Sequence, residues 1–205
     1  MATLLHLDSS GQHENSVSRK LTAHYVDLWR KSNPEGRVIY RDLVKSDIGF
    51  LTNEHIVAFN SPRESLNASQ QKLIEFPDVL MQELQDADVI LFGAPMYNFS
   101  VPAVLKAWID MIVRAGLTYS FAGGTPQGLL KNKRAVVVTT SGGDYSQAPM
   151  QQFDFVEPWF RSILGFIGIN DVTVFRSFGT DPEVIATSSK LAEQAIEREF
   201  AVLAS

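Results

Sequence analysis

Three short polar segments carry the residue types of a ligand site, and each follows an apolar run. The first holds the hydroxyls of Ser9, Ser10, Ser16 and Ser18 ahead of a helical pattern. Hydroxyls and the free amides of a helix N-terminus suit a phosphate group. Because neither G-x-G-x-x-G nor G-x-x-x-x-G-K-[ST] occurs there, the segment favours a monophosphate such as that of FMN over a dinucleotide or a Walker-type ligand. The alternative is that Ser16 only caps the helix.

The second segment is an aromatic-amide loop between Pro95 and Pro102. It follows residues 87–94, a short β-branched run that predicts a strand buried on both faces. Proline holds the residue before it in an extended conformation, so the loop is stiff at both ends. Such a loop at the carboxyl end of a parallel strand predicts a binding site for a planar ligand. The alternative is a turn whose aromatic side chains, Phe99 above all, complete the core.

The third segment, residues 140–145, contains the pair Gly142 and Gly143. Paired glycines allow the backbone to approach a ligand closely. Their amides are suited to donate hydrogen bonds to the carbonyl and N1 side of an isoalloxazine, with Tyr145 against the ring or bonded to it. The alternative is an ordinary turn between a strand and a helix.

Strands alternate with helices along the chain, which implies parallel pairing with right-handed crossovers. We expect a flavodoxin-like three-layer α/β sandwich whose five parallel strands follow the order 2-1-3-4-5, with helices on both faces. In that order the three polar segments meet at one edge of the sheet. The expected strands cover residues 3–7, 36–43, 87–94, 133–140 and 171–175. Residues 1–205 are expected to form one domain.

Helical periodicity fills the intervals between the strands. Helices are expected from residue 17, over about 70–85, from near 102, after 154 and from 181, whereas residues 44–69 look irregular and suit a lid or a dimer contact. Gly116 is the expected cap of the helix that begins near 102. The expected outward positions of this helix are Lys106, Asp110 and Arg114. Expected inward positions in the helices are Val17, Leu21, Tyr25, Leu28, Trp29, Leu105, Trp108, Ile109, Ile112, Phe155, Trp159, Ile163 and Phe166.

The amino-acid composition limits which partners and cofactors we expect. A net charge of −5 argues against nucleic acid or an anionic membrane as the main partner, although Arg19 and Lys20 are expected to attract a phosphate at the first segment. Without cysteine, redox chemistry must use a bound cofactor. The four histidines are scattered, so no metal site is expected. No apolar stretch reaches ~20 residues and no secretory signal is visible, so we expect a cytoplasmic protein without a membrane span.

Several motifs resemble those of the FMN-dependent NADH-azoreductases, also described as FMN-dependent NADH:quinone oxidoreductases. They are A-P-M-Y-N-F at 94–99, L-K-A-W-I-D at 105–110, R-A-G at 114–116 and L-G-F-I-G-I at 164–169. The resemblance implies an FMN phosphate on Ser10, Ser16, Val17 and Ser18. It implies an isoalloxazine and ribityl chain on Met96, Tyr97, Asn98 and Phe99, with Thr140, Ser141, Gly142 and Gly143 on the other side of the ring.

Two positions depart from the family pattern: Val17 stands where glutamine is frequent, and Ser141 where arginine occurs. Neither change removes a backbone donor. The resemblance also implies a homodimer with the flavin near the subunit interface, to which residues 44–69 contribute.

The main hypothesis is a flavoenzyme. NADH, with NADPH as a second candidate, reduces FMN and leaves, and a quinone or an aromatic azo compound then takes the hydride in the same space. Such a shared site predicts ping-pong kinetics. No side chain is expected to act as an obligatory acid or base, because the flavin supplies the chemistry. One alternative is a flavodoxin-type electron carrier or redox-sensing module, and another is a regulatory partner-binding protein that has lost the flavin.

Overall fold

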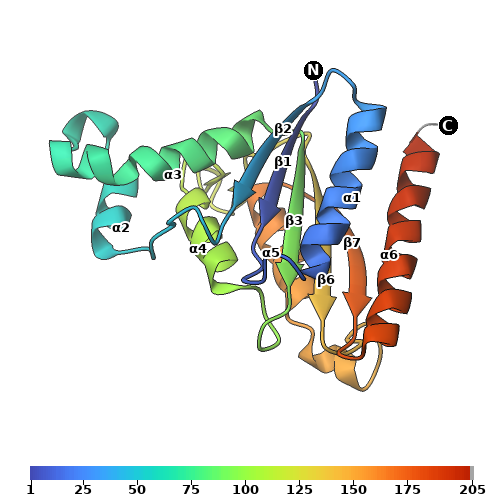
Figure 1. Cartoon of the computed structure of the whole chain (residues 1–205). Helices are drawn as coiled ribbons and strands as arrows, with labels where there is room; N and C mark the ends of the chain where they lie inside the picture. The colour runs from blue at the N-terminus through green and yellow to red at the C-terminus, as the bar shows by residue number, and fades with distance from the viewer. Residues whose placement is uncertain (204–205) are drawn as a thin grey trace.

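The computed structural model describes residues 1–203, and its centre is a five-stranded sheet. Neighbouring strands are parallel and follow the order β2-β1-β3-β6-β7 (Figure 1). This is the predicted order 2-1-3-4-5, which is therefore confirmed, with a short β4-β5 ribbon added outside the sheet. The strands of the sheet are β1 (Thr3–Asp8), β2 (Arg37–Asp42), β3 (Val89–Pro95), β6 (Arg134–Ser141) and β7 (Asp171–Phe178).

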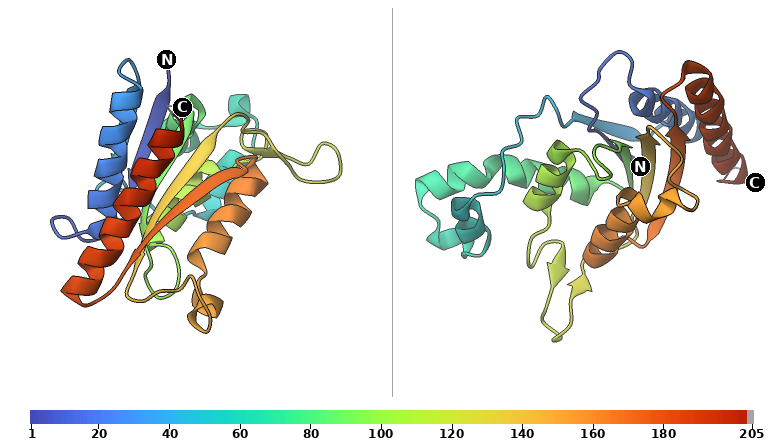
Figure 2. Two further views of the ribbon diagram at one scale, coloured as in Figure 1. Left: turned by 90° about the vertical axis from the view of Figure 1, so that its right-hand side faces the viewer. Right: turned by 90° about the horizontal axis from the view of Figure 1, so that it is seen from below.

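Five helices cover the two faces of this sheet. In the view from below, α1 and α6 lie on one side, and α3, α4 and α5 lie on the other (Figure 2). Their bounds are α1 (Val17–Ser32), α3 (Ala68–Asp86), α4 (Ala103–Ile112), α5 (Val156–Ile167) and α6 (Pro182–Leu203). The predicted three-layer sandwich with helices on both faces is confirmed.

Alternation along the strands divides the core into two layers. Leu91 faces α1 and α6, whereas its neighbours Ile90 and Phe92 face α3, α4 and α5. The ring of Phe92 lies 5.9 Å from that of Trp108 and 5.0 Å from that of Phe160, centroid to centroid. All three rings are almost fully buried, and each contributes roughly 1.5–3 kcal/mol to stability by leaving water. The central strand is thereby held rigidly, and so is the position where the aromatic loop leaves it.

Residues 44–69 contain more structure than the sequence predicted. Helix α2 (Asn53–Phe59) and the short 3-10 helix η1 (Arg63–Ser65) lie within them. Thr52 starts α2 through a capping box with His55, and Asn67 starts α3 in the same way with Gln70. Paired caps of this kind satisfy the first free amides of each helix. The prediction of an irregular segment was therefore wrong in this part.

Two predictions around α4 also need correction. The outward pair is confirmed, since Lys106 Nζ lies 2.6 Å from Asp110 Oδ1. Arg114, however, lies beyond the last residue of α4 and is buried, with its guanidinium 2.7 Å from Asp78 and over the ring of Phe59. Gly116 does not cap the helix; it has a φ of +78° in the turn before β4 (Tyr119–Ser120), which pairs with β5 (Gln127–Gly128).

In α5, the buried face is displaced by one residue from the predicted face. The buried positions are Val156, Phe160, Leu164 and Ile167, whereas the predicted Phe155, Trp159, Ile163 and Phe166 are exposed or partly exposed. Both sets have helical spacing, so periodicity alone could not separate them. None of the helices among residues 1–203 combines the length and the apolar character needed to cross a bilayer.

Candidate functional site

One cavity of about 270 Å3 opens where the carboxyl ends of β1, β3 and β6 meet. All three predicted segments contribute to its wall, together with a fourth that the sequence analysis missed. These four segments are the first loop (residues 9–16), the aromatic loop (95–101), the glycine loop (140–145) and the fourth loop (177–181). The predicted convergence at one edge of the sheet is confirmed.

The first loop brings hydroxyls and a helix N-terminus to the cavity. Ser10, Ser16 and Val17 line it, whereas Ser18 lies behind them with its Oγ 3.1 Å from that of Ser16. Ser16 is the N-cap of α1, and its hydroxyl accepts a hydrogen bond from the amide of Arg19. The first turn of α1 carries no acidic side chain. Because the first amides of a helix have no partner within it, this end of the cavity suits an anion.

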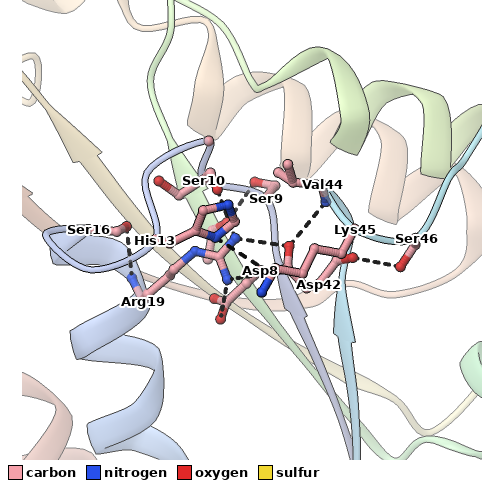
Figure 3. A network of polar contacts seen from close by, with 12 residues as sticks. Asp8, Ser9, Ser10, His13, Ser16, Arg19, Asp42, Val44, Lys45 and Ser46 are labelled. Carbon is pink, nitrogen blue, oxygen red and sulfur yellow. Dashed lines mark hydrogen bonds and ion pairs between the residues drawn. The ribbon is translucent and has the colours of Figure 1, made fainter.

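The buried charges beneath the first loop form a network (Figure 3). The guanidinium of Arg19 binds the Asp42 carboxylate through both oxygens, at 2.9 and 3.0 Å, and lies 3.6 Å from Asp8. Arg19 does not line the cavity. The expectation that its charge attracts a phosphate therefore needs correction, since two carboxylates already neutralise it. The signal in the sequence was an acidic residue at the end of each of two neighbouring strands, Asp8 and Asp42.

The aromatic loop places two of its four predicted residues in the cavity, Met96 and Tyr97. The Tyr97 hydroxyl accepts a hydrogen bond from the amide of Gly11 at 3.2 Å and lies 3.4 Å from Ser10 Oγ. This contact joins the aromatic loop to the first loop. In addition, the amide of Met96 donates to the carbonyl of Thr140 at 2.7 Å, which joins it to the glycine loop.

Asn98 and Phe99 form the tip of the aromatic loop and do not line this cavity. Both have positive φ, +50° and +68°, between Tyr97 and Ser100, whose backbones exchange two hydrogen bonds. Asparagine tolerates the left-handed conformation, whereas phenylalanine is strained in it. Asn98 instead lines a neighbouring cavity, and the ring of Phe99 packs 5.5 Å from that of Phe153.

The glycine loop contributes Thr140, Ser141 and Gly142 to the cavity. Gly143 does not line it; its carbonyl accepts a hydrogen bond from the hydroxyl of Ser141 at 2.7 Å. Tyr145, expected against a ring system, lies outside the cavity with its ring 6.0 Å from that of Phe99. Backbone and small side chains therefore form this wall.

The fourth loop was missed because the last strand is longer than predicted. Strand β7 continues to Phe178, three residues beyond the predicted end, and carries Ser177 and Phe178 to the cavity. Gly179 follows with a φ of +133°, and its amide donates to the carbonyl of Ser141 at 2.9 Å. A serine and a glycine after an apolar strand are the same signal that identified the glycine loop.

Comparisons with known proteins agree with this geometry. A family model described as a flavodoxin-like fold matches residues 2–199. A protein of Herminiimonas arsenicoxydans, named FMN-dependent NADH:quinone oxidoreductase, is 40% identical over 179 residues, which are 87% of this chain and 88% of the relative. The FMN-dependent NADH:quinone oxidoreductase 1 of Trichormus variabilis is 40% identical over 200 residues, 95% of each chain.

A solved structure shows the same fold. It is an FMN-dependent NADH-azoreductase of Bacillus anthracis in complex with FMN, with a TM-score of 0.85 and 24% identity over 97% of this chain and 99% of the other. The relatives at 40% identity are named as enzymes, which favours the oxidoreductase hypothesis over the electron carrier. The chain therefore belongs to the family of FMN-dependent NADH:quinone oxidoreductases and has the flavodoxin-like fold of that family.

Proposed function

We propose that this protein binds FMN in the cavity and transfers two electrons from NADH to quinones and to aromatic azo compounds, which are cleaved reductively. The observation that carries the proposal is a single cavity with a hydroxyl-rich helix N-terminus at one end and aromatic and glycine loops beside it. FMN has the matching two parts, a phosphate and a flat ring system. Bound FMN would supply the redox chemistry, accepting a hydride from the donor and passing it to the acceptor.

The residues on the cavity wall fit the two parts of FMN. For the phosphate we propose the hydroxyls of Ser10 and Ser16 and the first amides of α1, at Val17 and Ser18. These donors are neutral, so the phosphate would not need a lysine or arginine, in keeping with the neutralised charge of Arg19. Small donors at a helix N-terminus bind anions because the helix dipole and the amides act together.

For the ring system and ribityl chain we propose the aromatic loop on one side and Thr140, Ser141 and Gly142 on the other. Tyr97 would orient the ring, since its hydroxyl is held by the amide of Gly11. Asn98, Phe99 and Gly143 remain proposed contacts, although they lie outside the cavity wall in this structure. Among the described residues, those that line the cavity carry neutral side chains, and we propose that they bind and orient the cofactor.

The proposal is tested with the purified full chain. Incubation with FMN should give the visible absorption bands of a bound flavin, and anaerobic NADH should bleach them with one equivalent per site. Turnover of a quinone and of an azo dye, each measured with NADH and NADPH, should give the parallel double-reciprocal lines of a ping-pong mechanism. A protein that binds no FMN, or a flavin that NADH does not reduce, would contradict the proposal.

A matched pair of variants connects this activity to the cavity. Ser10→Ala removes a hydroxyl from the cavity wall, and we expect about tenfold weaker FMN binding, equivalent to about 1.4 kcal/mol. Ser162→Ala removes an exposed hydroxyl on α5 that bonds to the carbonyl of Pro158. We expect no change in FMN affinity for Ser162→Ala.

We also propose a homodimer in which residues 44–69 lie near the flavin of the partner subunit. Helix α2 and the start of α3 project away from the sheet (Figure 1). The apolar side chains of Phe50, Ile56 and Val57 are about half exposed or more there, at 75%, 48% and 45%. Exposed apolar groups that gather on one segment are typical of an interaction surface.

Because NADH is made and used inside cells, we propose the cytoplasm as the place of activity.

Sedimentation analysis tests the dimer. The double variant Phe50→Ser and Ile56→Ser should shift the protein toward the monomer. The control is Leu191→Ser on α6, which changes a similarly exposed apolar residue on another face, at 58% exposure. A wild-type monomer at all concentrations would contradict the dimer without affecting the FMN proposal.

A further inference from the structure

Arg19 uses all its hydrogen-bond donors on the protein itself. A guanidinium has five N–H groups, and the structure gives five contacts to four residues, of which Ser10 and Asp42 are labelled in Figure 3. Nε donates to the carbonyl of Gln12 at 3.0 Å, and Nη2 donates to the carbonyl of Ser10 at 2.8 Å. The other three donors bind the hydroxyl of Tyr40 and both carboxylate oxygens of Asp42, at 2.9–3.2 Å. No N–H group of Arg19 is left to bind a ligand directly.

The sheet holds the guanidinium in a fixed place. Asp8 and Asp42 lie at the ends of the adjacent strands β1 and β2, at paired positions of the register. Asp8 is fixed in turn by the hydroxyls of Thr22 at 3.0 Å and Tyr40 at 3.2 Å. Burial alone would lower the pKa of Arg19, but the hydrogen bond to Asp42 and the charges of Asp8 and Asp42 raise it. The Arg19 side chain is therefore always charged, and it holds the first loop at a fixed position relative to the sheet.

The two carbonyl contacts determine the direction of two amides in the first loop. The Ser10–Gly11 and Gln12–His13 peptide bonds are trans, because the cis bond in the described residues is Ala148–Pro149. In a trans peptide the C=O of one residue and the N–H of the next point in opposite directions. Since Arg19 binds both carbonyls, the amides of Gly11 and His13 point away from it. The amide of Gly11 indeed donates to the Tyr97 hydroxyl on the opposite side.

We infer that Arg19 is a positioning residue for the phosphate end of the cavity, a role that rests on the proposed function. It holds the first loop by the carbonyls of Ser10 and Gln12, two residues that line the cavity, and so fixes the Ser10 hydroxyl at the phosphate end, with the Gly11 amide turned toward Tyr97. Lysine cannot replace it, because an ammonium is a point charge without the planar fork that holds a carboxylate and two carbonyls together.

The test compares two ligands that differ only in the phosphate, FMN and riboflavin, on the flavin-free full chain. For Arg19→Lys we expect about tenfold weaker FMN binding and riboflavin binding that changes less than about twofold. The ³¹P signal of bound FMN should also shift. The matched control is Arg41→Lys, whose guanidinium also binds a carboxylate through two nitrogens, that of Glu83, with no contact to the first loop. Arg41→Lys should change neither affinity.

The outcomes separate the inference from the proposed function. Wild-type protein that does not prefer FMN to riboflavin would overturn the proposed phosphate site, and the inference with it. If wild type prefers FMN, two results for Arg19→Lys would overturn only the inference. One is an equal loss of affinity for FMN and riboflavin, and the other is no loss of affinity for either ligand.

A second variant keeps the inference testable if Arg19→Lys does not fold. Tyr40→Phe removes one of the five acceptors of Arg19 and retains every charge. We expect a weaker effect in the same direction, about two- to threefold on FMN and none on riboflavin. Unchanged binding of FMN to a folded Tyr40→Phe protein would count against the positioning role.

Discussion

The first loop and the aromatic loop form adjoining walls of one cavity, yet different forces hold them. The first loop lies on buried charges, with Arg19, Asp8 and Asp42 joined by hydrogen bonds to two strands. The aromatic loop has a tip of two left-handed residues, Asn98 and Phe99, supported by half-exposed rings.

This difference suits the two tasks of the proposed enzyme. The phosphate of a resident cofactor never changes, so a rigid, preorganised seat binds it at the lowest entropic cost. The aromatic wall must admit a nicotinamide and then flat acceptors of various shapes. Aromatic surface with few directed hydrogen bonds tolerates that variety. The comparison predicts that substitutions below the first loop cost more stability than substitutions at the aromatic tip.

The largest effect is expected from Asp42→Ala. It leaves the largely buried guanidinium of Arg19 without its two-oxygen partner, and losing one member of such a pair costs about 3 kcal/mol of unfolding free energy. Asp110→Ala is the control, since it removes the partner of Lys106 from an exposed pair on α4 and should cost about 1 kcal/mol or less. Chemical denaturation of the flavin-free proteins measures both. Equal losses would show that the network is no stiffer than a surface ion pair.

The Arg19–Asp42 pair also predicts how the stability of the protein changes in acid. Burial would raise the pKa of Asp42, but the hydrogen bond and charge of Arg19 outweigh it, so the pKa lies below its usual value. A lowered pKa in the folded state means that this stabilisation is complete above the unfolded value of about 3.9 and disappears as the pH falls through the folded value. Asp42→Asn should therefore flatten the acid limb of a stability–pH curve, and an unchanged limb would contradict the assignment.

Next in size is a comparison of two glycines at the ends of neighbouring strands. A Cβ on Gly93 would lie 2.4 Å from Asp8 Oδ1 and 3.2 Å from Thr22 Cγ2, so Gly93→Ala must displace the network, at a cost of about 1–3 kcal/mol. On Gly142 the nearest atom would be Thr180 Cγ2 at 3.5 Å, an ordinary contact. Gly142→Ala should cost less than about 0.5 kcal/mol in the flavin-free protein. Thermal unfolding measures the stability loss of each variant. Equal losses for Gly93→Ala and Gly142→Ala would mean that Asp8 is free to move.

A third comparison measures the strain at the aromatic tip. Phe99→Ala and Phe99→Gly both remove the ring, but only glycine adopts a φ of +68° without strain. We expect the glycine variant to be more stable than the alanine variant by about 1 kcal/mol, while both lose turnover of azo compounds. Denaturant unfolding gives the difference. An alanine variant as stable as the glycine variant would show that the turn is not strained.

Much of this architecture could be predicted from the sequence, because it rests on local signals. Apolar runs followed by serine, aromatic or glycine segments identified three walls of the cavity, and the alternation of strands with helices fitted the flavodoxin-like strand order. Other features depend on distant parts of the chain. Nothing near Arg19 shows that it meets Asp42, because that contact requires β1 and β2 to pair in register. Similarly, the positive φ of Phe99 has no local signal, since glycine is the residue expected in such a turn.

The smallest expected effect concerns Tyr40, at the edge of the network. Burial, followed by the charges of Asp8 and Asp42, raises the pKa of Tyr40 to about 12. Because the folded value exceeds the unfolded value of about 10, this contribution to stability is complete below pH ~10 and is lost as the pH rises from there toward 12. Tyr40→Phe should remove that alkaline loss and cost only about 0.5 kcal/mol at neutral pH, since its ring is more than half exposed.

Absorbance of the phenolate measures the titration of Tyr40. The difference between wild type and Tyr40→Phe is needed, because burial and Glu199 also raise the pKa of Tyr25. A wild-type difference curve with a midpoint near 10 would mean that the Tyr40 hydroxyl is free of the two carboxylates. The charged network would then end at Arg19, and the first loop would be anchored by the Asp42 pair alone.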